Sequence, residues 1–320
     1  MEVTVSILVA VYNASGTIAR FVASMAKQEL PGLEWIFVID GATDDSAVVL
    51  LRELETVGMI ASSRIILHSR NRGISVTRGT ALAAAHGEYI IFADPDDWVD
   101  EGFYSSLYAT AKECDADFIW EDFWLDVDGW ASRVIQGSKC SNAHVLCADI
   151  LRGSLHGATW NKLIRRSYLL EHGIEFLAKR VSLCEDLCFL CEILMTAPRI
   201  AYQNGCHYHY CVRSQSATQC LSSDSFASLD IVGRRLDGIC TTLDTHRALY
   251  HWKQGVRLSA AFSDNVTWGM FRNLFPEVDN LRGLKTNLVL KVMFWIAVRG
   301  GRSCMLTVYR LIRRRGKRRC

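Results

Sequence analysis

Three carboxylates follow an apolar run near residue 90. The run Tyr89–Ala93 has no charged residue, and Asp94, Asp96 and Asp97 come directly after it. Carboxylates this close repel one another, so a folded protein needs positive charge beside them. Oxygen ligands at the end of a strand suit Mg2+ or Mn2+. The alternative is an acidic loop whose aspartates cap the helix expected from Glu101 onward.

The elements before these aspartates alternate between strand and helix. We expect strands at 3–12, 35–39, 64–68 and 89–93, with a helix in each interval. Units of about thirty residues predict parallel βαβ packing with right-handed crossovers. Ligands bind outside the carboxyl ends of such strands. The polar residues that fall at those ends are Asn13, Asp40, the stretch 70–78 and the three aspartates.

The remaining sequence is less regular. We expect a helix at 101–114, a strand near 117–123, a loop through 129–137, a helix from 184 to before Pro198, and short strands at 200–202 and 206–211. Beyond Ser222 the pattern is helical. The sequence therefore predicts an α/β catalytic domain over 1–220, built on a mostly parallel, Rossmann-like sheet flanked by helices, and a C-terminal helical extension over 221–320. Neither a G-x-G-x-x-G turn nor a P-loop signature is present.

Composition describes a folded protein. Half of the 320 residues are hydrophobic, 22% are charged, and the formal net charge is only +2. No basic segment precedes the first strand, so we expect a cytoplasmic chain whose twelve cysteines are reduced. Helical spacing places Cys184, Cys188 and Cys191 on one face. We interpret that face as core, with zinc as the alternative.

Several short motifs occur together in a recognisable order. They are VSILVAVYN at 5–13, IDGATDDS at 39–46, NRGISVTR at 71–78, FADPDDW at 92–98, WNKL at 160–163, CED at 184–186 and YHY at 208–210 followed by Ser216. In this order the chain resembles a family-2 glycosyltransferase of the GT-A fold, of the bacterial polysaccharide-assembly or lipopolysaccharide-assembly type. The resemblance covers Val3 to about Thr218, roughly two thirds of the chain.

The resemblance implies a nucleotide-sugar site. Asp96 corresponds to a ligand of Mn2+ or Mg2+, Asp94 to a metal or ribose contact, and Asp97 to a residue behind them. The residues implied to bind the nucleotide sugar are Val11, Asn13, Asp40, Arg78, Asp94, Trp160 and Lys162. The sequence departs from the family at Ile39, where a second acid is common, and at Gly79, where Asn is common. Both departures affect which nucleobase of the donor the protein recognises.

Asp186 is the candidate catalytic base, because the resemblance assigns this role to the acid of the Glu185-Asp186 pair. A sugar hydroxyl is a poor nucleophile, so a positioned carboxylate must remove its proton. The alternative is that both acids only favour the helix macrodipole. Trp160, Asn161 and Lys162 are expected on the acceptor side, although an indole such as Trp160 or Trp98 equally fills a core.

Four other polar residues, two His, one Arg and one Ser, follow in the last third of the resembling region. His207 and His209 are interpreted as structural, with metal ligation as the alternative, while Arg213 and Ser216 are weak candidates for contact with the diphosphate.

The C-terminal region joins an apolar segment to a basic tail. Residues 288–298 are apolar apart from Lys291 and fall short of the roughly 20 residues that a membrane span needs. Residues 310–320 then contain seven Arg or Lys and no acid. This combination indicates a peripheral protein on the anionic inner face of the plasma membrane. A nucleic-acid-binding tail, which we do not expect, and a solvated terminus are the alternatives.

These observations lead to one functional hypothesis and two alternatives. We expect an inverting, metal-dependent glycosyltransferase that moves a sugar from a nucleotide-diphosphate sugar to a hydroxyl of a saccharide or lipid-linked saccharide. A UDP-sugar is the donor that we expect. The alternatives are a nucleotidyltransferase, which would need a basic residue within Tyr12–Thr17 that is missing, and a non-catalytic saccharide- or membrane-binding scaffold.

Overall fold

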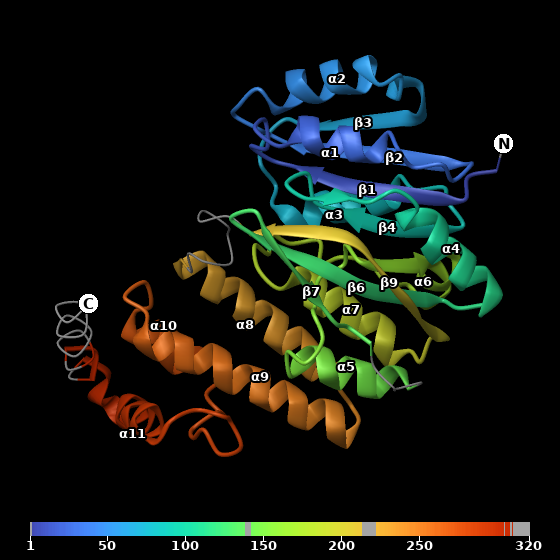
Figure 1. Ribbon diagram of the computed structural model, residues 1–320. Coiled ribbons are helices and arrows are strands. Elements are labelled where there is room, and N and C mark those ends of the chain that lie inside the picture. Colours follow the sequence, from blue (N-terminus) through green and yellow to red (C-terminus); the bar gives the residue numbers. More distant parts are fainter. Residues whose placement is uncertain (1, 138–141, 213–221, 304, 308, 310–320) are drawn as a thin grey trace.

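The computed structural model describes residues 2–137, 142–212, 222–303, 305–307 and 309 (Figure 1). These residues form a nine-stranded sheet with helices on both faces and further helices at one end. The α/β class with flanking helices and C-terminal helices is confirmed.

The first four strands form the parallel half of the sheet. They are β1 (Val5–Val11), β2 (Leu33–Asp40), β3 (Ser63–His68) and β4 (Tyr89–Ala93), in the order β3-β2-β1-β4. The crossovers between them contain α1 (Ile18–Met25), α2 (Ser46–Thr56) with a 3-10 turn at Ile60–Ser62, and α3 (Ile74–Ala83). The register pairs Val5 with both Leu33 and Tyr89, so these strands end together at one edge.

The second half of the sheet is mixed. Strand β8 (Lys162–Arg165) joins β4 to β6 (Phe118–Val127) and is antiparallel to both. Strand β9 (Ile200–Val212) is parallel to β6 and antiparallel to the two-residue β5 (Trp98–Val99). The two short strands expected at 200–202 and 206–211 are therefore one long strand, with register shifts opposite Glu121 and Asp122.

The prediction of a loop over 129–137 is wrong for residues 130–134. Residues Trp130–Val134 form β7, which pairs with β6 in a hairpin. The turn residues Asp128 and Gly129 have φ of 51° and 84°, as a two-residue turn of type I′ requires. Asp126 supports the turn because its Oδ1 accepts a hydrogen bond from the Gly129 amide at 3.1 Å.

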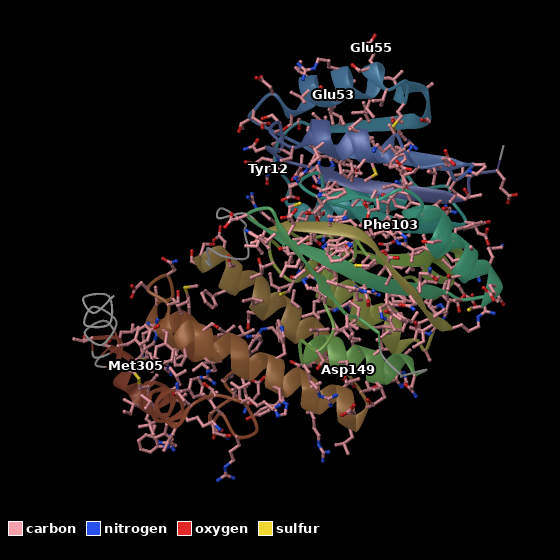
Figure 2. The ribbon with its side chains drawn as sticks, in the orientation of Figure 1. Tyr12, Glu53, Glu55, Phe103, Asp149 and Met305 are labelled. Carbon is pink, nitrogen blue, oxygen red and sulfur yellow. The ribbon has the colours of Figure 1, made fainter. Side chains whose placement is uncertain are left out.

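Apolar side chains pack on both faces of the sheet. On one face lie α1, α2 and α4 (Phe103–Glu113), and on the other lie α3, α5 (Ala143–Leu151) and α7 (Glu185–Met195). Helix α6 (Arg166–His172) follows β8. Figure 2 shows Phe103 in the interior and Glu55 of α2 pointing outward. Cys188 and Cys191 are fully buried in the second core, as interpreted from their helical spacing.

The C-terminal helices continue this packing. Helices α8 (Ser223–Asp237) and α9 (Leu243–Phe262) contribute Val232, Leu236 and Ala248 to the same cluster as α5 and α7. Helices α10 (Trp268–Asn273) and α11 (Leu288–Ile296), followed by a π-helical turn at Ala297–Gly301, complete a third cluster with α9. The predicted boundary near Leu221 lies outside the described residues, and the helices after it share a core with the sheet.

Among the described helices, none combines the length and the apolar character that crossing a bilayer requires.

Candidate active site

The centre of the site is a buried arginine among three carboxylates. Arg78 of α3 is 5% exposed. Its Nη1 donates to Glu185 Oε1 at 2.7 Å, its Nη2 donates to Asp94 Oδ1 at 3.0 Å, and Nη1 lies 3.6 Å from Asp186 Oδ2. The structure therefore brings together the aspartate at the end of β4 and the acidic pair at the start of α7.

Electrostatics explains why this arginine is tolerated in the interior. Burial disfavours its charge, but Asp94, Glu185 and Asp186 outweigh that effect and raise the pKa of the guanidinium. A buried charge without such partners would cost several kcal/mol, on the order of 3–5 when one partner of a buried pair is removed. The three carboxylates hold Arg78 charged, and Arg78 holds them side by side.

The two acids at the start of α7 differ in exposure. The side chain of Glu185 is 7% exposed and that of Asp186 is 22% exposed. Burial raises the pKa of both, while the charge of Arg78 limits the rise. Asp186 Oδ1 also accepts a hydrogen bond from the Leu187 amide at 2.9 Å. Asp186 is thus the acid that solvent reaches, and Glu185 is the anchor for Arg78.

Asp97 is enclosed by the protein. It is 1% exposed, and its two carboxylate oxygens accept hydrogen bonds from the Tyr208 hydroxyl at 2.7 Å and the Cys211 amide at 2.8 Å. Burial and the nearby charges of Asp96 and Asp94 raise the pKa of Asp97 well above its ordinary value. Asp97 fastens the loop after β4 to β9 and lies behind the exposed aspartates.

Asp94 and Asp96 remain as the oxygen donors for a metal. Both are partly exposed. Within the described part of the chain, no group of three or more His, Cys, Asp and Glu side chains has the geometry of a metal site. A magnesium-like ion commonly takes one or two carboxylates and completes its shell with phosphate and water. The two aspartates fit that kind of ion, and they do not form an all-protein cage.

Asp40 fixes the loop that leads to Arg78. The amides of Arg72 and Gly73 each donate to its carboxylate at 2.8 Å, and His68 Nδ1 lies 2.7 Å from Oδ1. Burial opposes the charge, but these hydrogen bonds lower the pKa of Asp40 overall. The neighbouring Gly41 has φ of 59°, and a Cβ there would lie 2.3 Å from the carbonyl carbon of Arg70. Asp40 is 3% exposed, so contact with a base or ribose stays a prediction.

Val11 and Asn13 lie at the end of β1. Val11 is buried, whereas Asn13 is exposed with φ of 48°. Asn13 Oδ1 accepts a hydrogen bond from the Thr43 amide at 2.9 Å, which joins the loops after β1 and β2. Their predicted contacts with the nucleotide are not tested by this geometry. A contact by Val11 would have to use its backbone.

Lys162 and Trp160 lie inside the fold. The ammonium of Lys162 donates to the carbonyls of His156 at 3.0 Å and Ala158 at 2.6 Å, and to Asn161 Oδ1 at 2.7 Å. Burial lowers the pKa of Lys162 to about 7, and the charge of Asp186 opposes that change. Trp160 is 2% exposed and stacks on Tyr208 at 4.3 Å between ring centroids. Of the two interpretations of this indole, core packing is the one that matches its burial. The contacts of Trp160 and Lys162 with a nucleotide sugar stay predictions.

Four candidate residues remain. Two are histidines with structural partners, and two lie outside the described part of the chain. His207 pairs with Glu121, and His209 pairs with Asp100 at 3.1 Å while it stacks on Trp98 at 3.4 Å. Both histidines have the structural partners that were expected. Arg213 and Ser216 lie outside the described residues.

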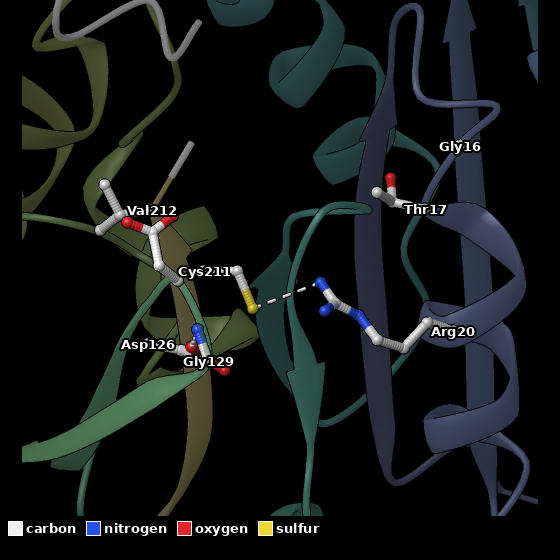
Figure 3. A pocket seen from close by; sticks show the side chains of 8 residues that line it. Gly16, Thr17, Arg20, Asp126, Gly129, Cys211 and Val212 are labelled. Atoms are coloured by element: carbon white, nitrogen blue, oxygen red, sulfur yellow. Dashed lines mark hydrogen bonds between the residues drawn. The ribbon is translucent and has the colours of Figure 1, made fainter. Parts of the chain in front are cut away.

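Two groups near the site were missed by sequence reasoning. The role of Glu185 as the partner of Arg78 was missed, although its place beside Asp186 was a usable signal. Arg20 of α1 was also missed. Its Nη2 donates to the Asp96 carbonyl at 2.6 Å and approaches Cys211 Sγ at 3.2 Å. Arg20 borders a hollow of about 450 Å³ between α1 and the β6–β7 hairpin (Figure 3). This hollow adjoins the aspartate loop on the α1 side, away from Asp186 on α7.

Comparison with known proteins identifies the family. The sequence profile described as "Glycosyl transferase family 2" matches residues 6–172, which is more than half of the chain. The chain belongs to glycosyltransferase family 2. The match contains β1–β4, Arg78 and the three aspartates, and it ends before Asp186. The recognition made from motifs is confirmed.

Relatives of this family member align over about two thirds of its length. It is 29% identical over 231 residues to EpsH of Bacillus subtilis strain 168, covering 70% of this chain and 65% of EpsH. It is 24% identical to the poly(ribitol-phosphate) beta-N-acetylglucosaminyltransferase TarP of Staphylococcus aureus, covering 68% and 65%. It is 28% identical to the succinoglycan biosynthesis protein ExoU of Rhizobium meliloti, covering 66% and 63%. The matched part is thus just under two thirds of each relative's own length.

Solved structures share the fold of this family-2 chain over nearly its whole length. S. aureus TarS 1-349 in complex with UDP-GlcNAc has a TM-score of 0.69 at 18% identity, covering 96% of this chain and 92% of that one. The mannosyltransferase PcManGT from Pyrobaculum calidifontis in complex with GDP-Man and Mn2+ has a TM-score of 0.56 at 14% identity, covering 97% and 88%. The GT-A architecture is confirmed.

Proposed function

We propose that this protein transfers a sugar from a nucleotide-diphosphate sugar to a hydroxyl of a saccharide acceptor, with inversion at the anomeric carbon. One observation carries the proposal. Arg78 contacts Asp94, Glu185 and Asp186, so the predicted donor aspartate and the predicted base meet in one ion-pair network. A single-displacement transfer needs donor and base on opposite sides of one reacting carbon, and such a network holds their relative position fixed.

On the donor side, the ends of β1, β2 and β4 provide the binding edge. Asp40 orders the loop 70–73, and α3 follows directly with Arg78. The buried guanidinium supplies a positive field near the diphosphate, where negative charge increases as the glycosidic bond breaks. A donor based on UDP is supported by TarS, a protein of similar fold solved with UDP-GlcNAc.

On the acceptor side, Asp186 is the base. The acceptor oxygen attacks the anomeric carbon, and its proton passes to Asp186 Oδ2 as the new carbon–oxygen bond forms. The old carbon–oxygen bond breaks with its electron pair staying on the diphosphate. The raised pKa of Asp186 suits this task, because a base is more effective when its pKa approaches the working pH.

Asp96 and Asp94 would hold Mn2+ or Mg2+. When bound, such an ion neutralises charge on the diphosphate as a Lewis acid. The P. calidifontis mannosyltransferase solved with GDP-Man and Mn2+ supports a divalent cofactor for this fold. The carbonyl of Asp96 is fixed by Arg20 and the neighbouring Asp97 by Tyr208, so the protein holds the aspartate loop in place.

The acceptor and the location follow from relatives and from charge. ExoU and TarP, which act in succinoglycan biosynthesis and on poly(ribitol-phosphate) by their names, support cell-surface polysaccharide synthesis. We propose a saccharide or lipid-linked saccharide acceptor and a cytoplasmic protein bound peripherally to the inner face of the plasma membrane. The basic residues 310–320 lie outside the described residues, so their contact with an anionic membrane stays a prediction.

A donor panel tests the proposal. Thermal shift is measured with UDP-, GDP- and dTDP-sugars, each with and without Mn2+, followed by detection of the released nucleotide diphosphate with a saccharide acceptor. We expect stabilisation by a UDP-sugar that increases with Mn2+. The absence of a shift with every donor would favour the scaffold alternative. Release of pyrophosphate from a nucleoside triphosphate with a sugar phosphate would instead identify a nucleotidyltransferase.

A further inference from the structure

Helix α11 is apolar on its inner and outer faces apart from Lys291, which is partly exposed. Its inner face places Met293, Phe294 and the following Ala297 in the third hydrophobic cluster, where Phe294 contacts Phe271 edge-on at 6.4 Å. This packing fixes the rotation of the helix and leaves the opposite face outside. The side chains exposed there are Leu288 at 75%, Val289 at 62%, Val292 at 49%, Trp295 at 51% and Ile296 at 37%.

The five exposed side chains form one stripe. Their spacing of one, three and four residues along an α-helix places them on a single side. A helix that is apolar all round belongs in a protein core or in a membrane, and a contiguous exposed apolar patch marks an interaction surface. In Figure 1, α11 lies at the end of the molecule opposite to α2, with no described element on its outer side.

The charge of the chain is strongly divided at this helix. Residues 280–320 contain 12 of the 36 Lys and Arg residues and none of the 34 Asp and Glu residues. This segment therefore has a formal charge of +12, and the other 279 residues have −10. The net value of +2 conceals this separation. A surface that receives α11 must be strongly anionic.

One cation lies directly on the stripe. The guanidinium of Arg299, at the end of the helix, is 4.0 Å from the ring centre of Trp295. Lys285 precedes the helix and is exposed. Tryptophan and arginine together are typical of a boundary where an apolar body meets charged groups, because the indole enters the apolar phase while the cation reaches the headgroups.

We propose that the outer face of α11 docks onto an anionic lipid bilayer and lies in its headgroup boundary. Such a boundary offers apolar area and negative charge together, as this helix requires. A nucleic acid would match the charge but would leave the aliphatic stripe exposed to water. A second copy of the chain would bring another segment of charge +12 against this one.

This inference rests on the membrane contact in the proposed function and assigns it to named side chains. It does not depend on the transfer reaction. Vesicle binding requires neither donor nor acceptor, so the two proposals can fail separately.

Co-sedimentation of the full chain with vesicles provides the test. One set of vesicles contains phosphatidylglycerol and phosphatidylcholine in equal parts, and the other contains phosphatidylcholine alone. The outer-face variant replaces three exposed residues of α11, namely Leu288→Gln, Val292→Gln and Trp295→Gln, so charge is unchanged. A control replaces three apolar residues of comparable exposure elsewhere, namely Val48→Gln, Leu67→Gln and Leu170→Gln, exposed at 66%, 68% and 64%.

We expect the wild-type protein and the control to sediment with anionic vesicles and not with neutral ones. The outer-face variant should lose at least about tenfold in partitioning, because part of the apolar transfer free energy is removed from three side chains. Circular dichroism and light scattering check that all three proteins are folded and report their oligomeric state.

Four outcomes would overturn the inference. The first is a wild-type protein that does not bind anionic vesicles, and the second is an outer-face variant that binds as well as the control. The third is a wild-type dimer that the outer-face variant breaks, which would show that a second copy covers the stripe. Binding to a DNA duplex that the variant loses equally would assign the face to nucleic acid instead.

Discussion

At the scale of single residues, Asp186 and Glu185 show how neighbouring acids take different tasks. Glu185 is 2.7 Å from Arg78 and buried, while Asp186 is 3.6 Å from it and partly exposed. If the two acids exchanged positions, the proposed base would lose its access to the acceptor. Function at this site therefore depends on which acid α7 turns outward, and adjacency in sequence does not reveal that.

Asp186→Asn is expected to reduce transfer by about 10²–10⁴-fold, the usual contribution of a general base. Donor affinity should change little, because Asp186 contacts Arg78 only at 3.6 Å. Turnover measures the first quantity and calorimetric titration with the nucleotide sugar measures the second. Glu192→Gln, at another acid of α7, is the control and should remain active. Wild-type turnover in the Asp186→Asn enzyme would show that Asp186 is not the catalytic base.

Lys162→Met is expected to move the acid limb of the pH–rate profile to higher pH. The base works when deprotonated, so activity falls as pH decreases through the pKa of Asp186. Below about pH 7 Lys162 carries its proton, and that charge lowers the pKa of Asp186. Its removal raises the pKa, so the loss of activity begins at a higher pH. A variant whose rate decreases equally at every pH would show that Lys162 only supports the segment 156–162.

At the scale of elements, Asp40 connects the end of β2 to the start of α3. Its carboxylate accepts both amides of the turn at Arg72 and Gly73, and α3 then carries Arg78 into the site. The position of the buried guanidinium is therefore set partly by a residue of another strand.

Asp40→Ala is expected to lower the free energy of unfolding by about 3 kcal/mol, since the part-buried amides of Arg72 and Gly73 lose their acceptor. Donor affinity should decrease as well, because the loop before Arg78 is released. Urea denaturation and calorimetry measure the two effects. Asp40→Asn keeps one acceptor oxygen and should lie between wild type and Ala. If the Asp40→Ala protein is destabilised but binds the donor as tightly as wild type, this loop does not contribute to the nucleotide site.

Much of the element order was predictable, for physical reasons that apply to particular segments. Strands β1, β2 and β4 are continuous apolar runs because they are covered on both faces, and such runs are distinctive. Strand β7 was missed because Trp130 to Arg133 are exposed, so no alternation marks them. Strand β8 was missed because its four residues pair only through neighbours that are distant in sequence.

The candidate site was less predictable than the strands. The residue types at Asp94, Asp96, Arg78 and Asp186 indicated the chemistry. Sequence could not show that Asp97 is closed off by Tyr208 and Cys211, or that Trp160 is buried against Tyr208. Those facts depend on β9, which follows the aspartates by more than a hundred residues. The sequence indicated candidate reactive groups, and tertiary contacts determine which of them solvent reaches.

At the scale of the whole molecule, the C-terminal helices α8 and α9 pack in one hydrophobic cluster with α5 and α7. Val232 of α8 and Ala248 of α9 are fully buried in the cluster that covers α5 and α7. Helix α7 also carries the proposed base, Asp186, so the packing of α8 against α7 would stabilise its position. Removal of residues 222–320 would expose this cluster to water.

Val232→Asp is expected to lower the melting temperature by about 5 °C or more, because a buried unpaired charge costs several kcal/mol. Transfer activity should fall with it, since α7 loses its support. Ala227→Asp, on the exposed side of the same helix, is the matched control. Calorimetry should show one transition in the wild-type protein. A separate early transition that leaves the sheet intact in Val232→Asp would show that the C-terminal helices fold as an independent unit.

The pairing of β6 with β9 has a consequence for how the chain folds during synthesis. Strands β1–β4 are complete once Ala93 has emerged, but Phe118 of β6 pairs with Ile200, 82 residues later in the chain. Contacts this distant form slowly, because the long intervening loop must close first. A nascent chain therefore has strands β1–β4 assembled, with the proposed donor edge, while the β6 edge still lacks its partner β9. That edge is where aggregation would start, and it is where a chaperone would act during translation.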